Sequence, residues 1–116
     1  MSAPDTVLII EDELDSCLLW KTYLSHLKFT VYTALTLKEG LELVKRIKPS
    51  IIFLDNNLPD GLGWEQVDFI KAQIPECRIN LVSAFQFDKE KWSDKDVRIV
   101  EKPLTLSRIR SLLSSP

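Results

Sequence analysis

The sequence contains little of the residue types from which many metal and nucleophile sites are built. Its 116 residues include one histidine, His26, and two cysteines, Cys17 and Cys77. One histidine cannot supply a histidine-rich metal site, and the two cysteines lack the close paired spacing of zinc ligands. We therefore expect a surface position for His26 and free thiols at both cysteines, as in a reducing compartment.

Long apolar runs and clusters of basic residues are also missing. No apolar stretch approaches the roughly 20 residues that a membrane-spanning helix needs. Residues 1–5 lack the charged and apolar regions of a signal peptide, so we expect a cytoplasmic protein without a membrane partner. The formal net charge is −2 and the lysines and arginines are scattered. This argues against direct binding of nucleic acid, because phosphate contacts need a basic face.

What is present suits one folded domain. Apolar residues make up 45% of the chain and charged residues 28%, which is enough for one continuous core beneath an ordinary polar surface. A length of 116 residues is a common size for a domain. We therefore expect residues 1–116 to form a single domain.

Short apolar runs alternate with amphipathic stretches along the whole chain. The runs are continuously apolar and rich in β-branched residues, which indicates strands buried on both faces of a parallel sheet. The expected strands are Thr6–Ile10, Phe29–Ala34, Ser50–Leu54, Arg78–Ser83 and Val97–Val100.

Apolar residues recur at helical spacing between and after these runs. Thr36 and Glu39 form a capping box at the start of the second helical stretch, and Thr105 is the expected N-cap of the last. The polar segment 85–96 leaves room for only one or two helical turns. Strands that alternate with helices predict a doubly wound α/β sheet with right-handed crossovers. The expected helices lie around residues 17–27, 37–47, 67–74 and 106–113.

Acidic residues follow two of the expected strands. Glu11 and Asp12 come after the first strand and Asp55 comes after the third. The carboxyl ends of parallel strands meet at one edge of such a sheet, so these three carboxylates should lie close together. A cluster of like charges either raises a pKa or recruits a cation. Ligands that offer only oxygen select a hard ion such as Mg²⁺.

Two further polar residues follow the fourth and fifth strands. The Ser83 hydroxyl can donate a hydrogen bond to a phosphoryl group, and the Lys102 ammonium can complement its charge. With a metal and Lys102 withdrawing negative charge, Asp55 becomes a credible acceptor in phosphoryl transfer.

In these features the chain resembles the receiver domains of response regulators, including those of the chemotaxis-regulator type, over nearly its whole length. No single motif is specific, but five in this order, each at a strand end, are. The matching motifs are Glu11-Asp12 after VLII, Asp55 after IIFL, the segment 57–63 (NLPDGLG), Ser83-Ala84 after INLV and Lys102-Pro103 after VRIV.

The resemblance implies a fold and a role for each site residue. The family's fold is flavodoxin-like, with five parallel strands in the order 2-1-3-4-5; here the fourth helix would be short or irregular. The implied roles are Asp55 as phosphoacceptor, Glu11, Asp12, Asp55 and the backbone carbonyl of Asn57 as ligands of Mg²⁺ (which Mn²⁺ can replace), Ser83 as a phosphoryl contact, and Lys102 as its charge partner ahead of a peptide bond that is usually cis.

The resemblance also implies partners. The phosphoryl group would come from a sensor histidine kinase or a phosphotransfer protein. An output domain or a partner protein would bind through the face of residues 84–113. Such a chain is not an enzyme in the ordinary sense, although it assists its own phosphorylation and dephosphorylation.

Two departures from the family motivate an alternative. Ile99 stands where the family usually has Tyr or Phe, three residues before the lysine, and the stretch from Ser83 to Lys102 is a few residues shorter than usual. The alternative is a receiver-like interaction module that phosphorylation does not switch. A phosphatase with an Asp nucleophile would need a second Asp at position 57, which is Asn. A flavin-binding protein would need a phosphate loop where Glu11, Asp12 and Glu13 would repel phosphate.

Overall fold

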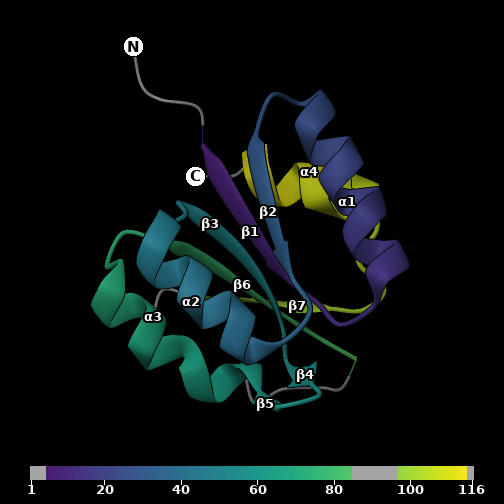
Figure 1. Cartoon of the computed structure of the whole chain (residues 1–116). Helices are drawn as coiled ribbons and strands as arrows, with labels where there is room; N and C mark the ends of the chain where they lie inside the picture. Colours follow the sequence, from purple (N-terminus) through teal and green to yellow (C-terminus); the bar gives the residue numbers. More distant parts are fainter. Residues whose placement is uncertain (1–4, 85–96, 115–116) are drawn as a thin grey trace.

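The fold is built on a central sheet of parallel strands (Figure 1). A computed structural model describes residues 5–84 and 97–114 of the chain. Its helices and strands are β1 (Thr6–Ile10), α1 (Leu14–His26), β2 (Thr30–Ala34), α2 (Leu37–Ile47), β3 (Ile51–Asp55), β4 (Asn57–Leu58), β5 (Gly61–Leu62), a 3₁₀ helix (Gly63–Gln66), α3 (Val67–Gln73), β6 (Arg78–Ser83), β7 (Val97–Glu101) and α4 (Leu106–Ser114).

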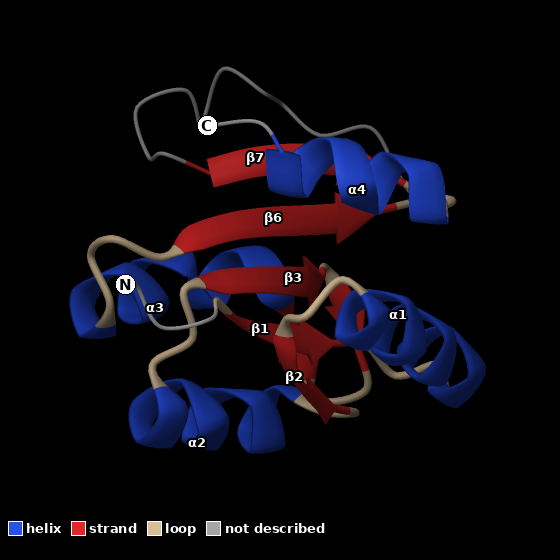
Figure 2. Ribbon diagram, turned by 90° about the horizontal axis from the view of Figure 1, so that it is seen from above, coloured by secondary structure: helices blue, strands red, loops and turns tan. Residues whose placement is uncertain are grey.

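The five long strands have the order β2-β1-β3-β6-β7, and all neighbouring pairs are parallel (Figure 2). Counted along the chain, this is the expected order 2-1-3-4-5, so the predicted flavodoxin-like α/β fold is confirmed. From β1 the chain first adds β2 on one side, and the later strands β3, β6 and β7 are then added on the other side of β1. The carboxyl ends of β1 and β3 therefore form the crevice in which ligands of such sheets bind.

Helices cover both faces of the sheet, with α1 and α4 on one side and α2 and α3 on the other (Figure 1). Successive residues of a strand point to opposite faces. Val7 and Ile9 accordingly pack in the cluster that includes Trp20 of α1 and Ile109 of α4. Leu8 and Ile10 pack in the other cluster, with residues of α2 and α3. Burial on both faces explains why the strands are continuously apolar in sequence.

The helix ends follow the expected capping residues in two places. The Thr36 hydroxyl accepts a hydrogen bond from the Glu39 N–H at 3.2 Å, and the Thr105 hydroxyl accepts one from the Arg108 N–H at 3.1 Å. Both predicted N-caps are thereby confirmed. Capping of this kind satisfies amides that have no acceptor within their own helix.

The structure differs from the prediction after β3. The turn formers at residues 56–61 predict a loop, but in the structure Asn57 pairs with Leu62 and Leu58 with Gly61 in a small antiparallel hairpin. The third helix begins with a 3₁₀ turn at Gly63. Strand β3 also runs one residue further than expected, because Asp55 is in register with Val82 of β6. The predicted short helix at 85–96 lies outside the described residues.

The expectations about the histidine and the two cysteines agree with the structure. His26 is exposed at the end of α1, and both cysteines are free thiols, although they are fully buried. Among residues 5–84 and 97–114, no helix is both long enough and apolar enough to cross a membrane.

Candidate functional site

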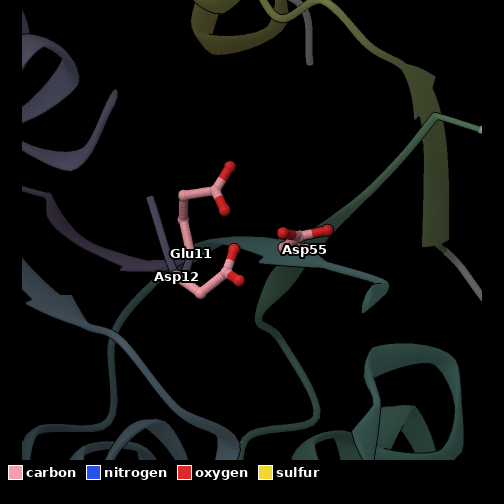
Figure 3. Close-up of side chains that lie close together, drawn as sticks. All are labelled: Glu11, Asp12 and Asp55. Carbon is pink, nitrogen blue, oxygen red and sulfur yellow. The ribbon is translucent and has the colours of Figure 1, made fainter. Parts of the chain in front are cut away.

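Three carboxylates meet at the carboxyl ends of β1 and β3. A carboxylate oxygen from each of Glu11, Asp12 and Asp55 lies within 4.8 Å of the other two. Figure 3 shows the Glu11 and Asp12 side chains on the side that faces Asp55. The closeness follows from the sheet, because Ile10 and Leu54 are in register on neighbouring strands. Glu11 and Asp55, the residues that come next, are therefore adjacent at the strand ends.

Lys102 directly follows β7 in the chain, and its side chain extends to the same carboxylates. Its Nζ lies 3.1 Å from Asp55 Oδ2 and 3.4 Å from Glu11 Oε1. The main chain of Lys102 is tied to the end of β6, since its N–H donates to the Ser83 carbonyl at 2.8 Å. The peptide bond to Pro103 is cis, as the resemblance implied. The ammonium group thus bridges two carboxylates that come from different strands.

Backbone N–H groups also donate hydrogen bonds to two of the carboxylates. The Asn57 N–H donates to Asp55 Oδ1 at 3.1 Å, and the Glu13 N–H donates to Glu11 Oε2 at 3.3 Å. Ser83 is buried at the end of β6, one residue beyond the partner of Asp55 in the sheet. All the residues that the sequence singled out are therefore placed at one edge of the sheet.

Burial and like charge shift the protonation of this site. Glu11 is 4% exposed, and its burial, together with hydrogen bonding to Asp55 and Asp12, raises its pKa to about 8. Burial alone would lower the pKa of Lys102, but the bond and charge of Asp55 outweigh it and raise that pKa. Near neutral pH the Glu11 carboxyl group therefore keeps its proton, beside the ammonium group of Lys102. That proton is one a divalent cation can replace.

The donor set fits a hard divalent cation. The cluster offers carboxylate oxygens, and Asp12 is exposed while Glu11 and Asp55 are buried. Mg²⁺ is bound in proteins by one or two carboxylates and keeps several waters, so a half-open oxygen site suits it. The three carboxylates among the predicted metal ligands thus lie close enough together to bind one such ion.

Two residues of the site had no role in the sequence-based prediction. Asn56 is buried; its Oδ1 accepts from the Trp64 N–H at 3.1 Å and its carbonyl accepts from the Gly63 N–H at 2.8 Å. Gly63 lies so close to the main chain that a Cβ there would be 2.6 Å from the Asp55 carbonyl oxygen. In the sequence, Asn56 is a polar residue two positions after an apolar run and Gly63 ends the motif 57–63, and neither feature indicates a contact partner.

Comparison with known proteins agrees with this geometry. The family model of the response regulator receiver domain matches residues 7–114. The transcriptional regulatory protein DpiA of Escherichia coli (strain K12) is 38% identical over 78 residues, which are 65% of this chain and 34% of DpiA. The response regulator protein PilR of Pseudomonas aeruginosa is 29% identical over 111 residues, 93% of this chain and 25% of PilR. This chain thus spans about a third of the length of DpiA and a quarter of that of PilR.

Solved structures show the same fold. The chain is similar to a crystal structure of a signal receiver domain from Vibrio parahaemolyticus, with a TM-score of 0.86. The two share 23% sequence identity, and the match covers 97% of this chain and 88% of that one. At this identity the likeness concerns the fold.

Proposed function

The chain belongs to the response regulator receiver domain family, and from this we propose that Asp55 accepts a phosphoryl group in two-component signalling. One observation carries the proposal: the Asp55 side chain lies beside the carboxylates of Glu11 and Asp12 and 3.1 Å from the Lys102 ammonium. These are the two surroundings that a carboxylate needs to accept a phosphoryl group, a place for a divalent cation and a fixed positive charge.

The proposed reaction is the transfer of a phosphoryl group to the Asp55 carboxylate. One carboxylate oxygen attacks phosphorus while the bond from phosphorus to the donor breaks. With a phosphohistidine donor, a P–N bond breaks and the imidazole nitrogen takes up a proton; with acetyl phosphate, a P–O bond breaks and acetate leaves. The Asn57 N–H holds Oδ1 and Lys102 holds Oδ2 before the reaction. Lys102 and the Ser83 hydroxyl would then bind the oxygens of the incoming phosphoryl group.

The proposed metal ligands are Glu11, Asp12, Asp55 and the backbone carbonyl of Asn57. A Mg²⁺ ion, or Mn²⁺ in its place, would offset the negative charge of the carboxylates and of the phosphoryl oxygens. Glu11 and Asp12 would orient the ion, and Glu11 would release its proton when the ion binds.

The partners follow from the same proposal. The donor would be a sensor histidine kinase or a phosphotransfer protein in the cytoplasm. We further propose that residues 1–116 act as one domain and that the face of residues 84–113 passes the signal to an output domain or partner. The chain would be a phosphoacceptor that assists its own reaction and not a turnover enzyme.

The alternative is an interaction module that phosphorylation does not switch. Ile99 motivates it, because this residue is partly buried against the core and carries no aromatic ring that could change its position. The two functions differ in two measurable respects: only the first requires that Asp55 is labelled and that labelling changes the structure.

Labelling with acetyl phosphate tests the proposal. The intact mass of the chain is measured after incubation with and without Mg²⁺, for the wild type, Asp55→Asn and the control Asp15→Asn, whose exposed carboxylate is on α1. We expect one hydroxylamine-labile phosphoryl group on the wild type and the control, only with Mg²⁺, and none on Asp55→Asn. An unlabelled wild type would refute the proposed function.

A further inference from the structure

The hairpin β4–β5 follows the acceptor Asp55 in the chain and contacts its side chain. It begins two residues after Asp55, and the N–H of its first residue, Asn57, donates to Asp55 Oδ1. Each of its strands has only two residues. A hairpin this short is not stable by itself in water, so other contacts must hold it.

Asp60, at the tip of the hairpin, makes such a contact. Its Oδ1 accepts from the Leu37 N–H at 2.8 Å and its Oδ2 accepts from the Lys38 N–H at 3.0 Å. These are the first two amides of α2, which have no acceptor within the helix. Both oxygens of one carboxylate are thus used at a helix end that favours negative charge. The two backbone bonds lower the pKa of Asp60, so the group is charged at neutral pH.

The helix that receives Asp60 is itself firmly placed. Leu37 and Val44 of α2 are buried in the core cluster between the helix and the sheet. The hairpin also packs directly on Leu37, since a Cβ on Gly61 would lie 3.0 Å from Leu37 Cδ1. Asp60 therefore joins a short hairpin to an element that the core holds in position.

We propose that Asp60 is a positioning residue for the acceptor loop. By holding the hairpin against α2, it keeps the Asn57 N–H on Asp55 and the Asn57 carbonyl where the divalent cation binds. The inference rests on the proposed function, in which Asn57 supplies a ligand. Asp60 itself contacts neither the cation nor the phosphoryl group.

Thr36 provides a matched control. Its hydroxyl caps the same helix through the Glu39 N–H, but the bond joins two residues of one helix end and does not involve the hairpin. Asp60→Asn and Thr36→Ala both weaken the N-terminus of α2, and both should lower the melting temperature. Only Asp60→Asn also releases the hairpin, because its amide turns one of the two acceptors into a donor.

The test compares wild type, Asp60→Asn and Thr36→Ala by three measurements. These are the hydrogen exchange of the Asn57 and Leu62 amides, the dissociation constant for Mg²⁺ followed by tryptophan fluorescence, and the rate of labelling by acetyl phosphate. We expect faster exchange at both amides in Asp60→Asn and a Mg²⁺ affinity about tenfold weaker, the size of effect that outer residues of metal sites have. Slower labelling in this variant should be recovered at high Mg²⁺. Thr36→Ala should match the wild type in all three.

Each other outcome counts against the inference. If Asp60→Asn binds Mg²⁺ as the wild type does, or if Thr36→Ala shows the same loss, Asp60 has only a structural role. If the wild type is not labelled at all, the proposed function is wrong and the positioning role falls with it. A labelled wild type with unchanged Asp60→Asn overturns only the inference about Asp60.

Discussion

Glu11 and Lys102 show how a few residues set the charge of the site. Lys102 lies within hydrogen-bonding distance of Asp55 and within 3.4 Å of Glu11, so one ammonium group serves two carboxylates. Burial first, and then the neighbouring carboxylates, raise the pKa of Glu11 to about 8. One ammonium group does not balance three neighbouring carboxylates, two of them buried, which is the physical reason to expect a further cation there.

Cys77 gives a prediction of pH dependence far from the site. Burial raises the pKa of this thiol to about 12, from an ordinary value of 9.0. The folded state therefore holds the proton more tightly than the unfolded state. The stability that results is present below pH 9 and is lost as pH rises from there toward 12. For one thiol we expect a loss of about 1 kcal/mol in the free energy of unfolding between about pH 8.5 and pH 10.

Urea unfolding at these two pH values measures this loss. Cys77→Ala removes the titrating group, so the pH-dependent part should shrink by the contribution of one thiol. Cys17, whose pKa burial raises to about 11, should continue to contribute. Equal pH dependence in wild type and Cys77→Ala would show that the thiol is not the cause.

A substitution of Gly63 should disturb the main chain of the acceptor Asp55. In Gly63→Ala the new Cβ would be 2.6 Å from the Asp55 carbonyl oxygen and 3.0 Å from Leu54 Cγ. The main chain of Asp55 must shift, which should cost about 1–3 kcal/mol in the free energy of unfolding. The shift should also slow labelling by acetyl phosphate.

Gly40→Ala serves as the control for this variant. The nearest atoms to its Cβ would be Cδ1 and Cγ1 of Ile10, at 2.5 and 2.8 Å, which belong to a side chain and not to the main chain of Asp55. We expect near-normal labelling of Gly40→Ala at a temperature where both variants are folded. Normal labelling of Gly63→Ala would mean that the close approach does not position Asp55.

The charged residues of the site were predictable from the sequence because they lie at or just after strand ends. Glu11, Asp55 and Lys102 each follow an apolar run, and parallel strands bring such ends together. Asp60 and Gly63 were not assigned a role for the opposite reason. What they contact is set by packing between elements, namely the N-terminus of α2 for Asp60 and the main chain of Asp55 for Gly63.

Among the helices and strands, too, local sequence features were predictable and pairings between short segments were not. The long strands were predicted to within one residue at each end, because an apolar run is a local property of the sequence. The β4–β5 hairpin was not predicted, because pairs of two residues carry no detectable period of alternation. Its turn formers, Pro59-Asp60, suggested a loop and gave no indication of the pairing on either side.

The end of α2 offers a stabilising substitution. Lys48 caps this helix in the left-handed region, at φ 52°. A side chain is disfavoured in that conformation and glycine is not, so Lys48→Gly should raise the free energy of unfolding by about 1 kcal/mol. Glu42→Gly, at an exposed position inside the same helix, should lower it by about 1 kcal/mol. Urea unfolding of both variants checks the pair, and a loss of stability in Lys48→Gly would contradict the assigned cap.

Mg²⁺ should stabilise the molecule as a whole. A ligand that binds only the folded state raises stability with its concentration, so the melting temperature of the wild type should rise as Mg²⁺ is added. Asp12→Ala removes one repelling carboxylate and one ligand. This variant should melt higher than the wild type without Mg²⁺ and gain little when Mg²⁺ is added. Differential scanning calorimetry in chelator and in Mg²⁺ measures both effects.

A lower melting temperature of Asp12→Ala in chelator would show that the acidic cluster is already satisfied without a cation. Equal stabilisation by K⁺ at the same ionic strength would show screening of charge and not a site.

The proposed function depends on Asp55 being the residue that receives the phosphoryl group. Reduction with borohydride converts an aspartyl phosphate into homoserine, so peptide mass spectrometry of the reduced chain identifies the labelled position. After incubation with acetyl phosphate and Mg²⁺, we predict homoserine at position 55, and none when the cation is chelated. Homoserine at another position, or at 55 in equal amount without the cation, would contradict the account.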